Sequence, residues 1–240
     1  DTIIMPLPKI ETPKYELKVP STGKMVTYRP YLVKEEKILM MAMESQDNRQ
    51  MIRAVKDVIS ACTEGEVDIS KLAMFDLEYI FSMLRSKSVG ETTSVGVKCE
   101  SCETKNDVDV NIEGVRVNVP KDDSGKTIYL TDDIGVILRY PSVDVISDFE
   151  SRGGNEVDNV FGMVGSCIET IFSGDDMYDV DQQSKKDLQE FVESLSTEQF
   201  NKIRQFVEDM PTAAIDVQFK CLNCGTDNDI EVKGLANFFS

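Results

Sequence analysis

The sequence predicts an α+β fold, made of helices and short antiparallel strands, with a four-cysteine site formed by two Cys-x-x-Cys hairpins. Two observations lead to this prediction. Strand patterns and helix patterns occur in blocks along the chain, whereas a parallel α/β protein alternates between them. The spacing Cys-x-x-Cys occurs at Cys99 and Cys102 and again at Cys221 and Cys224, each time between two strand-like segments. Hydrophobic residues form 41% of the 240 residues, which is enough for a folded core.

The composition excludes several classes of function. The 43 acidic residues outnumber the 26 basic ones and give a net charge of -17, which argues against nucleic-acid binding because phosphate backbones are held by clustered Lys and Arg. This charge favours partners that are basic or apolar. The chain has no histidine, so Ser-His-Asp catalysis, Cys-His catalysis and histidine-containing metal sites are excluded. No stretch approaches about 18 consecutive apolar residues, so we expect no membrane span.

For residues 1–33, the sequence predicts an extended N-terminal arm followed by a hairpin. Three prolines within the first 13 residues fix φ and remove N–H donors, which favours extended backbone over helix. The arm either lies across the protein's own surface or docks on a neighbouring subunit. Two strands are expected at residues 15–19 and 25–33, around a turn that contains Pro20 and Gly23.

Residues 34–90 predict a helical segment, because apolar residues recur there at helical spacing. The polar run at residues 45–48 is expected to break or kink it. Ser70 is expected to cap a further helix that continues to Arg85. Five methionines between Met25 and Met51 could form an adaptable binding stripe, but their helical spacing favours core packing.

Residues 113–212 predict an intervening α+β module. Its strands are expected at residues 115–119, 127–130 and 136–140, and its helices near 156–172, 185–195 and 198–209. Ser184 and Thr197 are the expected N-caps of the last two helices, and Pro211 stops the second of them. Four aspartates between residues 175 and 181 are interpreted as a solvated acidic loop, since the Gly that a calcium loop requires is absent.

The strongest signal is an internal repeat of strand, cysteine pair and strand. Residues 98–110 and 220–232 are identical at seven of 13 positions. We therefore expect two related hairpins, formed by residues 91–112 and 213–234. Gly225 follows the second cysteine pair and suits a positive φ, whereas the first pair has Glu103 in that position, which leaves the geometry of its turn open.

The predicted metal ligands are Cys99, Cys102, Cys221 and Cys224. Four thiolates in a tetrahedron form a structural zinc site of the zinc-ribbon type, with no open coordination position for catalysis. Backbone N–H groups of the turns, together with Lys98 and Lys220, are expected to offset the negative charge of the thiolates. A redox dithiol and two turns without metal are the alternatives.

A zinc ion at this position would join segments that are far apart in the sequence. It would close a loop over residues 103–220 and clamp the intervening module onto the N-terminal half, so that metal binding is part of folding. The remaining cysteines, Cys62 and Cys167, lie among apolar residues and are interpreted as small core side chains. The apolar C-terminal tail at residues 235–240 either packs back on the second hairpin or anchors a partner.

Several segments resemble the baseplate hub proteins of T-even-type contractile-tailed bacteriophages, the myoviruses. They are LPKIETP (residues 7–13), LKVPSTG (17–23), YRPYLVKEEK (28–37), FDLEYIF (75–81) with residues 84–85, FKCLNCG (219–225), residues 234–235 and residues 238–239. The similarity is spread over most of the chain. It implies a protein without enzymatic activity, with no catalytic or cofactor-binding residues, that is made in the host cytoplasm and belongs to the baseplate hub or its assembly pathway.

Two functions follow from this resemblance. The first is a structural subunit of the tail baseplate hub in the virion. The alternative is an assembly factor, or chaperone, that holds the hub or the tape-measure protein and is absent from the mature tail. Either function implies other baseplate hub or tail proteins as partners. A carboxylate hydrolase and a nucleic-acid-binding zinc ribbon are further alternatives, and the acidic residues beside both cysteine pairs argue against the second.

Overall fold

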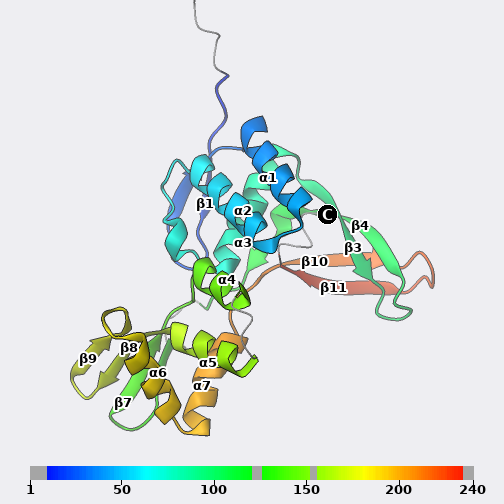
Figure 1. Ribbon diagram of the computed structural model, residues 1–240. Coiled ribbons are helices and arrows are strands. Elements are labelled where there is room, and N and C mark those ends of the chain that lie inside the picture. The colour runs from blue at the N-terminus through cyan, green and yellow to red at the C-terminus, as the bar shows by residue number, and fades with distance from the viewer. Residues whose placement is uncertain (1–9, 121–125, 152–155, 235–240) are drawn as a thin grey trace, which may run out of the picture.

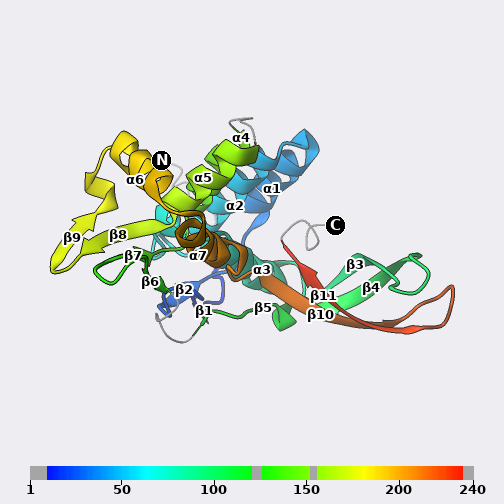
Figure 2. The same cartoon turned by 90° about the horizontal axis from the view of Figure 1, so that it is seen from below.

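The computed structural model describes residues 10–120, 126–151 and 156–234, and its architecture is α+β, as predicted. It has three parts: a body of N-terminal helices, a projecting pair of hairpins that we call the hairpin arm, and a module of strands and helices (Figure 1). The hairpin arm and the module extend to opposite sides of the body (Figure 2). The predictions for residues 1–9 and 235–240 concern positions outside the described residues. The division into five sequence segments stays a prediction.

The body contains a two-stranded sheet and three α-helices. Its elements are β1 (Tyr15–Lys18), β2 (Met25–Tyr28), α1 (Val33–Ser45), α2 (Asn48–Cys62), the 3-10 turn η1 (Ile69–Lys71) and α3 (Met74–Ser88). The Asp47 side chain accepts a hydrogen bond from the N–H of Arg49 and caps α2, and Gln46 has a φ of 52°, so the predicted break between the first two helices is confirmed. Ile59, Leu77 and Phe81 are fully buried within its hydrophobic core.

The second predicted strand of the body is shorter than expected. Strand β2 ends at Tyr28 and not at residue 33. Pro30 has no N–H to continue the ladder, and Val33 already begins α1. The turn before β2 is tied to α3, since the Asp76 carboxylate accepts from the N–H of Ser21 at 2.9 Å.

The helix expected after Ser70 begins later than predicted. Ser70 lies in η1 and donates its N–H and its hydroxyl to the side chain of Asp68, so it does not cap α3. The N-cap of α3 is Ala73, whose N–H is bound by the Asp76 carboxylate at 3.2 Å. A carboxylate in the first turn therefore binds the backbone N–H of the N-cap residue, and no serine side chain caps α3.

The prediction that the methionines pack in the core was wrong for four of the five. Met40 and Met41 are 58% and 61% exposed, and Met25 and Met43 are exposed as well. Met51 alone among these five packs against the core of the body. The side chains of α1 that are buried are Glu35, Leu39 and Ala42. Apolar residues occur on both faces of α1. Their helical spacing therefore did not identify the face that is buried.

The hairpin arm is built from the two repeats. Its elements are β3 (Thr92–Lys98), β4 (Lys105–Asn111), the 3-10 turn η2 (Ile112–Gly114), β5 (Arg116–Val117), β10 (Ala213–Lys220) and β11 (Asp227–Lys233). Both hairpins are antiparallel, and in β3 buried and exposed residues alternate strictly. Val95 and Val97 of the first hairpin belong to the same buried cluster as Val217 of the second, so apolar faces join the two hairpins. The predicted hairpins are therefore present, within one or two residues of their expected ends.

The module has a four-stranded antiparallel sheet and its own hydrophobic core. Its elements are β6 (Thr127–Tyr129), β7 (Ile134–Leu138), α4 (Val143–Ser151), α5 (Glu156–Ser166), β8 (Ile168–Ser173), β9 (Asp176–Asp179), the 3-10 turn η4 (Val180–Gln182), α6 (Lys185–Ser194) and α7 (Thr197–Glu208). The strand order is β6-β7-β8-β9. Ser184 caps α6 as predicted, whereas the N-cap of α7 is Ser196 and not Thr197, because the Ser196 hydroxyl accepts from the N–H of Gln199.

The predicted helix at residues 156–172 was too long. Helix α5 ends at Ser166, and the β-branched run that follows forms β8, in which Ile171 is paired with Val136 of β7. The acidic segment was also only partly a loop, since it contains strand β9. Asp181 binds Arg139 through two short hydrogen bonds of 2.6 and 2.7 Å. Helix α4 was not predicted at all.

The body and the module meet at α4 and at the chain before it. The N–H of Val143 donates to the carbonyl of Leu72 at 2.9 Å. The Tyr140 ring contacts Phe75 of α3 and Phe206 of α7, with centroid distances of 5.0 and 5.4 Å. Among the described residues, no helix has both the length and the apolar composition needed to cross a bilayer.

Candidate metal centre

The four predicted ligands meet at the free end of the hairpin arm. The Sγ atoms of Cys99 and Cys224 are 3.6 Å apart, and those of Cys102 and Cys221 are also 3.6 Å apart. All four Sγ atoms lie within 4.8 Å of one another. Each close pair therefore contains one sulfur from each hairpin, and neither hairpin could form this cluster alone.

The sulfur spacing fits a tetrahedral metal. A regular tetrahedron with metal–sulfur bonds of about 2.3 Å has sulfur–sulfur edges of about 3.8 Å, close to the two observed distances. Cys99 and Cys221 are buried, Cys102 is half-buried and Cys224 is exposed. A four-thiolate set of this size suits zinc, because zinc binds thiolates and takes four ligands in structural sites. All four ligand positions would be filled by protein, which leaves none for a substrate.

The two cysteine pairs lie in turns of the same geometry. The N–H of Cys99 donates to the carbonyl of Thr104 at 3.0 Å, and the N–H of Cys221 donates to that of Thr226 at 2.9 Å. The turns close through Glu103 N–H and Gly225 N–H, each of which donates at 2.9 Å to the carbonyl of the first cysteine of its pair. Glu103 has a φ of 57° and Gly225 a φ of 75°. The first turn therefore adopts the glycine conformation although it has a glutamate there.

We expect Glu103→Gly to stabilise the protein by about 1 kcal/mol. The left-handed conformation is unfavourable by about 1–2 kcal/mol for a residue with a Cβ, and the extra freedom of glycine in the unfolded chain offsets part of the gain. Chemical denaturation of the two proteins measures the difference. Glu100→Gly is the matched control, because Glu100 has a negative φ in the same turn and its replacement should destabilise. A loss of stability in Glu103→Gly would contradict the strained turn.

Polar groups contact the sulfurs, and at Cys102 they favour the thiolate. The Cys102 Sγ contacts the Thr104 hydroxyl at 3.3 Å, and the Cys224 Sγ contacts the Thr226 hydroxyl at 3.2 Å. Hydrogen bonding to Thr104 is the main reason why the pKa of Cys102 is lowered to about 6. The amide of Asn223 also donates to Cys102 Sγ, at 3.6 Å. Donors at Cys102 therefore stabilise the deprotonated form that binds a metal, whereas at Cys224 the effect of Thr226 is outweighed by the neighbouring Cys102 and by burial, which raise its pKa.

The structure brings the four cysteines that the sequence predicted as ligands together, but the polar residues around them were not predicted. Thr104 and Thr226 occupy equivalent positions of the repeat, as do Asn106 and Asn228. Because the same threonine and the same asparagine occur in both copies, the repeat itself could have identified these residues as part of the site. The expected charge-offsetting role of Lys98 and Lys220 stays a prediction.

The other two cysteines do not belong to the centre. Cys62 and Cys167 are buried, as predicted for core side chains. Burial raises the pKa of each thiol to about 11, so both are neutral at physiological pH. Neither has the exposure or the low pKa that a reactive thiol needs.

Comparisons with known proteins place this chain among phage tail components. It is 26% identical over 227 residues to a protein named "Baseplate hub assembly protein gp26" from Enterobacteria phage T4, in an alignment that covers 94% of this chain and 98% of that protein. No solved structure matches the chain with statistical significance. Residues 12–240 match the family described as "T4 bacteriophage base plate protein". Because this match spans almost the whole sequence, the chain belongs to the T4 bacteriophage base plate protein family.

Proposed function

We propose that this chain is a structural subunit of a phage tail baseplate hub, without enzymatic activity, that acts through contacts with other baseplate hub or tail proteins. One observation carries the proposal: the family match over residues 12–240, which agrees with a relative, matched over 98% of its length, whose name refers to the baseplate hub. The protein would be made in the host cytoplasm and located in the tail baseplate of the virion. A zinc ion held by Cys99, Cys102, Cys221 and Cys224 would stabilise it.

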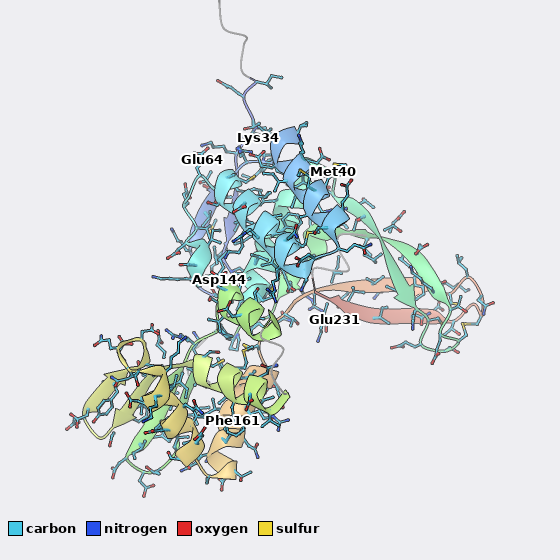
Figure 3. All side chains as sticks on the ribbon, in the orientation of Figure 1. Lys34, Met40, Glu64, Asp144, Phe161 and Glu231 are labelled. Carbon is cyan, nitrogen blue, oxygen red and sulfur yellow. The ribbon has the colours of Figure 1, made fainter. Side chains whose placement is uncertain are left out.

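The surface of α1 supports a role in protein contacts. Val33, Met40 and Met41 are 79%, 58% and 61% exposed, and Leu32 and Ile38 are exposed beside them. Met40 extends from the helix at the edge of the body in Figure 3. Exposed apolar residues scattered singly are normal, but a helix that presents several of them together is typical of an interaction site. Methionine side chains adapt to the shape of a partner.

The candidate metal centre supports a structural role for the ion. Four thiolates leave no coordination position for water or substrate, so such an ion holds chain segments together. The chain has no histidine, which removes the commonest general base from consideration. The net charge of -17 suits partners that are basic or apolar and does not suit nucleic acid.

The name of the T4 relative favours a second candidate function. That protein is called an assembly protein, which agrees with a factor that holds the hub, or the tape-measure protein, during construction and then leaves. Such a factor would need the same contact surfaces as a resident subunit. The two functions differ only in whether the chain stays in the finished tail.

Quantitative mass spectrometry of purified tails and of isolated hub intermediates tests both candidates. A resident subunit is present in both preparations at a constant ratio to the other hub proteins. An assembly factor is present in the intermediates and depleted from the tails. Absence from both preparations, in infected cells that contain the protein, would contradict a baseplate function of either kind.

A further inference from the structure

Two buried asparagines connect the hairpins of the arm reciprocally. Asn106 on β4 and Asn228 on β11 occupy the same position of the repeat and are only 4% and 5% exposed. The Asn106 Oδ1 accepts from the N–H of Leu222 at 3.0 Å, and the Asn228 Oδ1 accepts from the N–H of Glu100 at 3.0 Å. Each amide thus extends from its own hairpin to the cysteine turn of the other one.

Each asparagine is also fixed within its own hairpin. The Asn106 Nδ2 donates to the carbonyl of Thr104 at 2.8 Å, and the Asn228 Nδ2 donates to that of Thr226 at 2.9 Å. The Asn106 Nδ2 also lies 3.6 Å from the Sγ of Cys221. Both ends of each buried amide therefore have partners, which is the condition under which a buried polar network specifies one arrangement.

None of these bonds requires a metal ion. Apart from the contact with the Cys221 Sγ, they join backbone and amide groups, and valines of both hairpins belong to one apolar cluster. The bonds attach Glu100 and Leu222, which each directly follow the first cysteine of a pair. Groups that hold these turns together also set the distance between the two cysteine pairs.

We infer that Asn106 and Asn228 are positioning residues that hold the four sulfurs at ligand spacing before a metal binds. The centre is then assembled in the metal-free protein, and the ion fills a site that already exists. This changes the expectation from the sequence, in which the metal itself brings the hairpins together. The claim that these asparagines raise metal affinity rests on the proposed zinc site. The claim that they hold the two hairpins together does not.

Amide hydrogen exchange, followed by NMR on the full chain, tests the inference. In the wild-type protein, the N–H groups of Glu100 and Leu222 should stay protected after a chelator has removed metal, because their acceptors are asparagine side chains. The N–H of Ser101, an exposed residue of the same cysteine turn, is the internal reference amide. If Glu100 and Leu222 exchange as fast as Ser101 in the metal-free protein, the inference is overturned without any substitution.

Substitutions should give a crossed pattern that general destabilisation would not. Asn228→Ala should speed exchange at Glu100 and Asn106→Ala at Leu222, each by at least about fivefold, as expected for one lost hydrogen bond. Asn223→Ala is the matched control, since the exposed Asn223 contacts Cys102 Sγ and Thr104 but neither of the two amides. Equal acceleration at both amides in all three variants would contradict the assignment.

Metal titration separates this inference from the proposed zinc site. With Co²⁺ as the probe, the Asn106 and Asn228 variants should bind about 10- to 100-fold more weakly than wild type, while the thiolate-to-cobalt absorption keeps its position. If wild-type protein binds no Co²⁺ or Zn²⁺ but the two asparagine variants show the crossed exchange pattern, the zinc site alone is refuted. If wild-type protein binds metal but the variants lack that pattern, the positioning role alone is refuted.

Discussion

Replacing Cys221 by Ser should release the zinc ion that we propose for this centre and should strongly destabilise the protein. The site would keep three of its four thiolates, and zinc affinity depends on all of them. An ion present at about 1,000 times its dissociation constant stabilises the folded state by about 4 kcal/mol, and most of this would be lost. Metal content per chain and thermal unfolding, with and without chelator, measure the two effects.

The control for this variant is a cysteine outside the centre. Cys62 is buried in the body, so Cys62→Ser should lower stability through packing but leave the zinc content unchanged. A chelator should lower the melting temperature of Cys62→Ser and of wild type, and should have little effect on Cys221→Ser. Full zinc content and unchanged unfolding in Cys221→Ser would contradict the metal centre.

Replacing Glu35 by Ala should destabilise the protein by about 3–5 kcal/mol, the range found when one partner of a buried ion pair is removed. Glu35 is 3% exposed and binds Arg29 at 2.8 Å, and its second oxygen accepts from the N–H of Leu32 at 2.8 Å. The substitution therefore leaves the Arg29 guanidinium without its carboxylate and removes the N-terminal capping contact of α1. Denaturant unfolding measures the change, and Glu36→Ala, at an exposed position of the same helix, should stay within about 0.5 kcal/mol of wild type.

The ion pair between Glu35 and Arg29 also makes the stability difference between wild type and Glu35→Ala depend on pH. Burial alone would raise the pKa of Glu35, but the hydrogen bonds from Arg29 and from the N–H of Leu32 outweigh it and hold the pKa below its usual value of 4.5. A carboxyl with a lowered folded pKa stabilises the protein above its unfolded pKa, and this contribution is lost as the pH falls through the folded value. The stability difference between wild type and Glu35→Ala should therefore be constant above about pH 5 and shrink in more acidic solution. A difference that grows on acidification would contradict the ion pair.

Local sequence rules predicted those features that depend on local chemistry. The two Cys-x-x-Cys turns were predicted because the spacing of their ligands is set within four residues. Helix α6 was predicted because Ser184 is followed by residues that complete a cap, and the hairpin strands because their alternation is strict. Even the positive φ at Glu103 could be anticipated from Gly225 in the second copy of the repeat.

The remaining features depend on partners that lie far away in the sequence. Residues 168–173 have apolar spacing compatible with a helix, and only their pairing with β7 makes them a strand. In α1, apolar residues occur on both faces, so the buried face is decided by the ion pair between Glu35 and Arg29 and by packing against α2. The role of Asn106 could not be predicted from its own hairpin, because the Asn106 Oδ1 accepts from the N–H of Leu222 in the second hairpin.

X-ray absorption spectroscopy at the zinc edge, combined with native mass spectrometry on protein purified without added metal, tests the metal centre most directly. A zinc held by both cysteine pairs predicts one ion per chain with four sulfur neighbours at about 2.3 Å. A shell containing oxygen or nitrogen ligands, or a correctly folded chain that carries no metal at all, would contradict it.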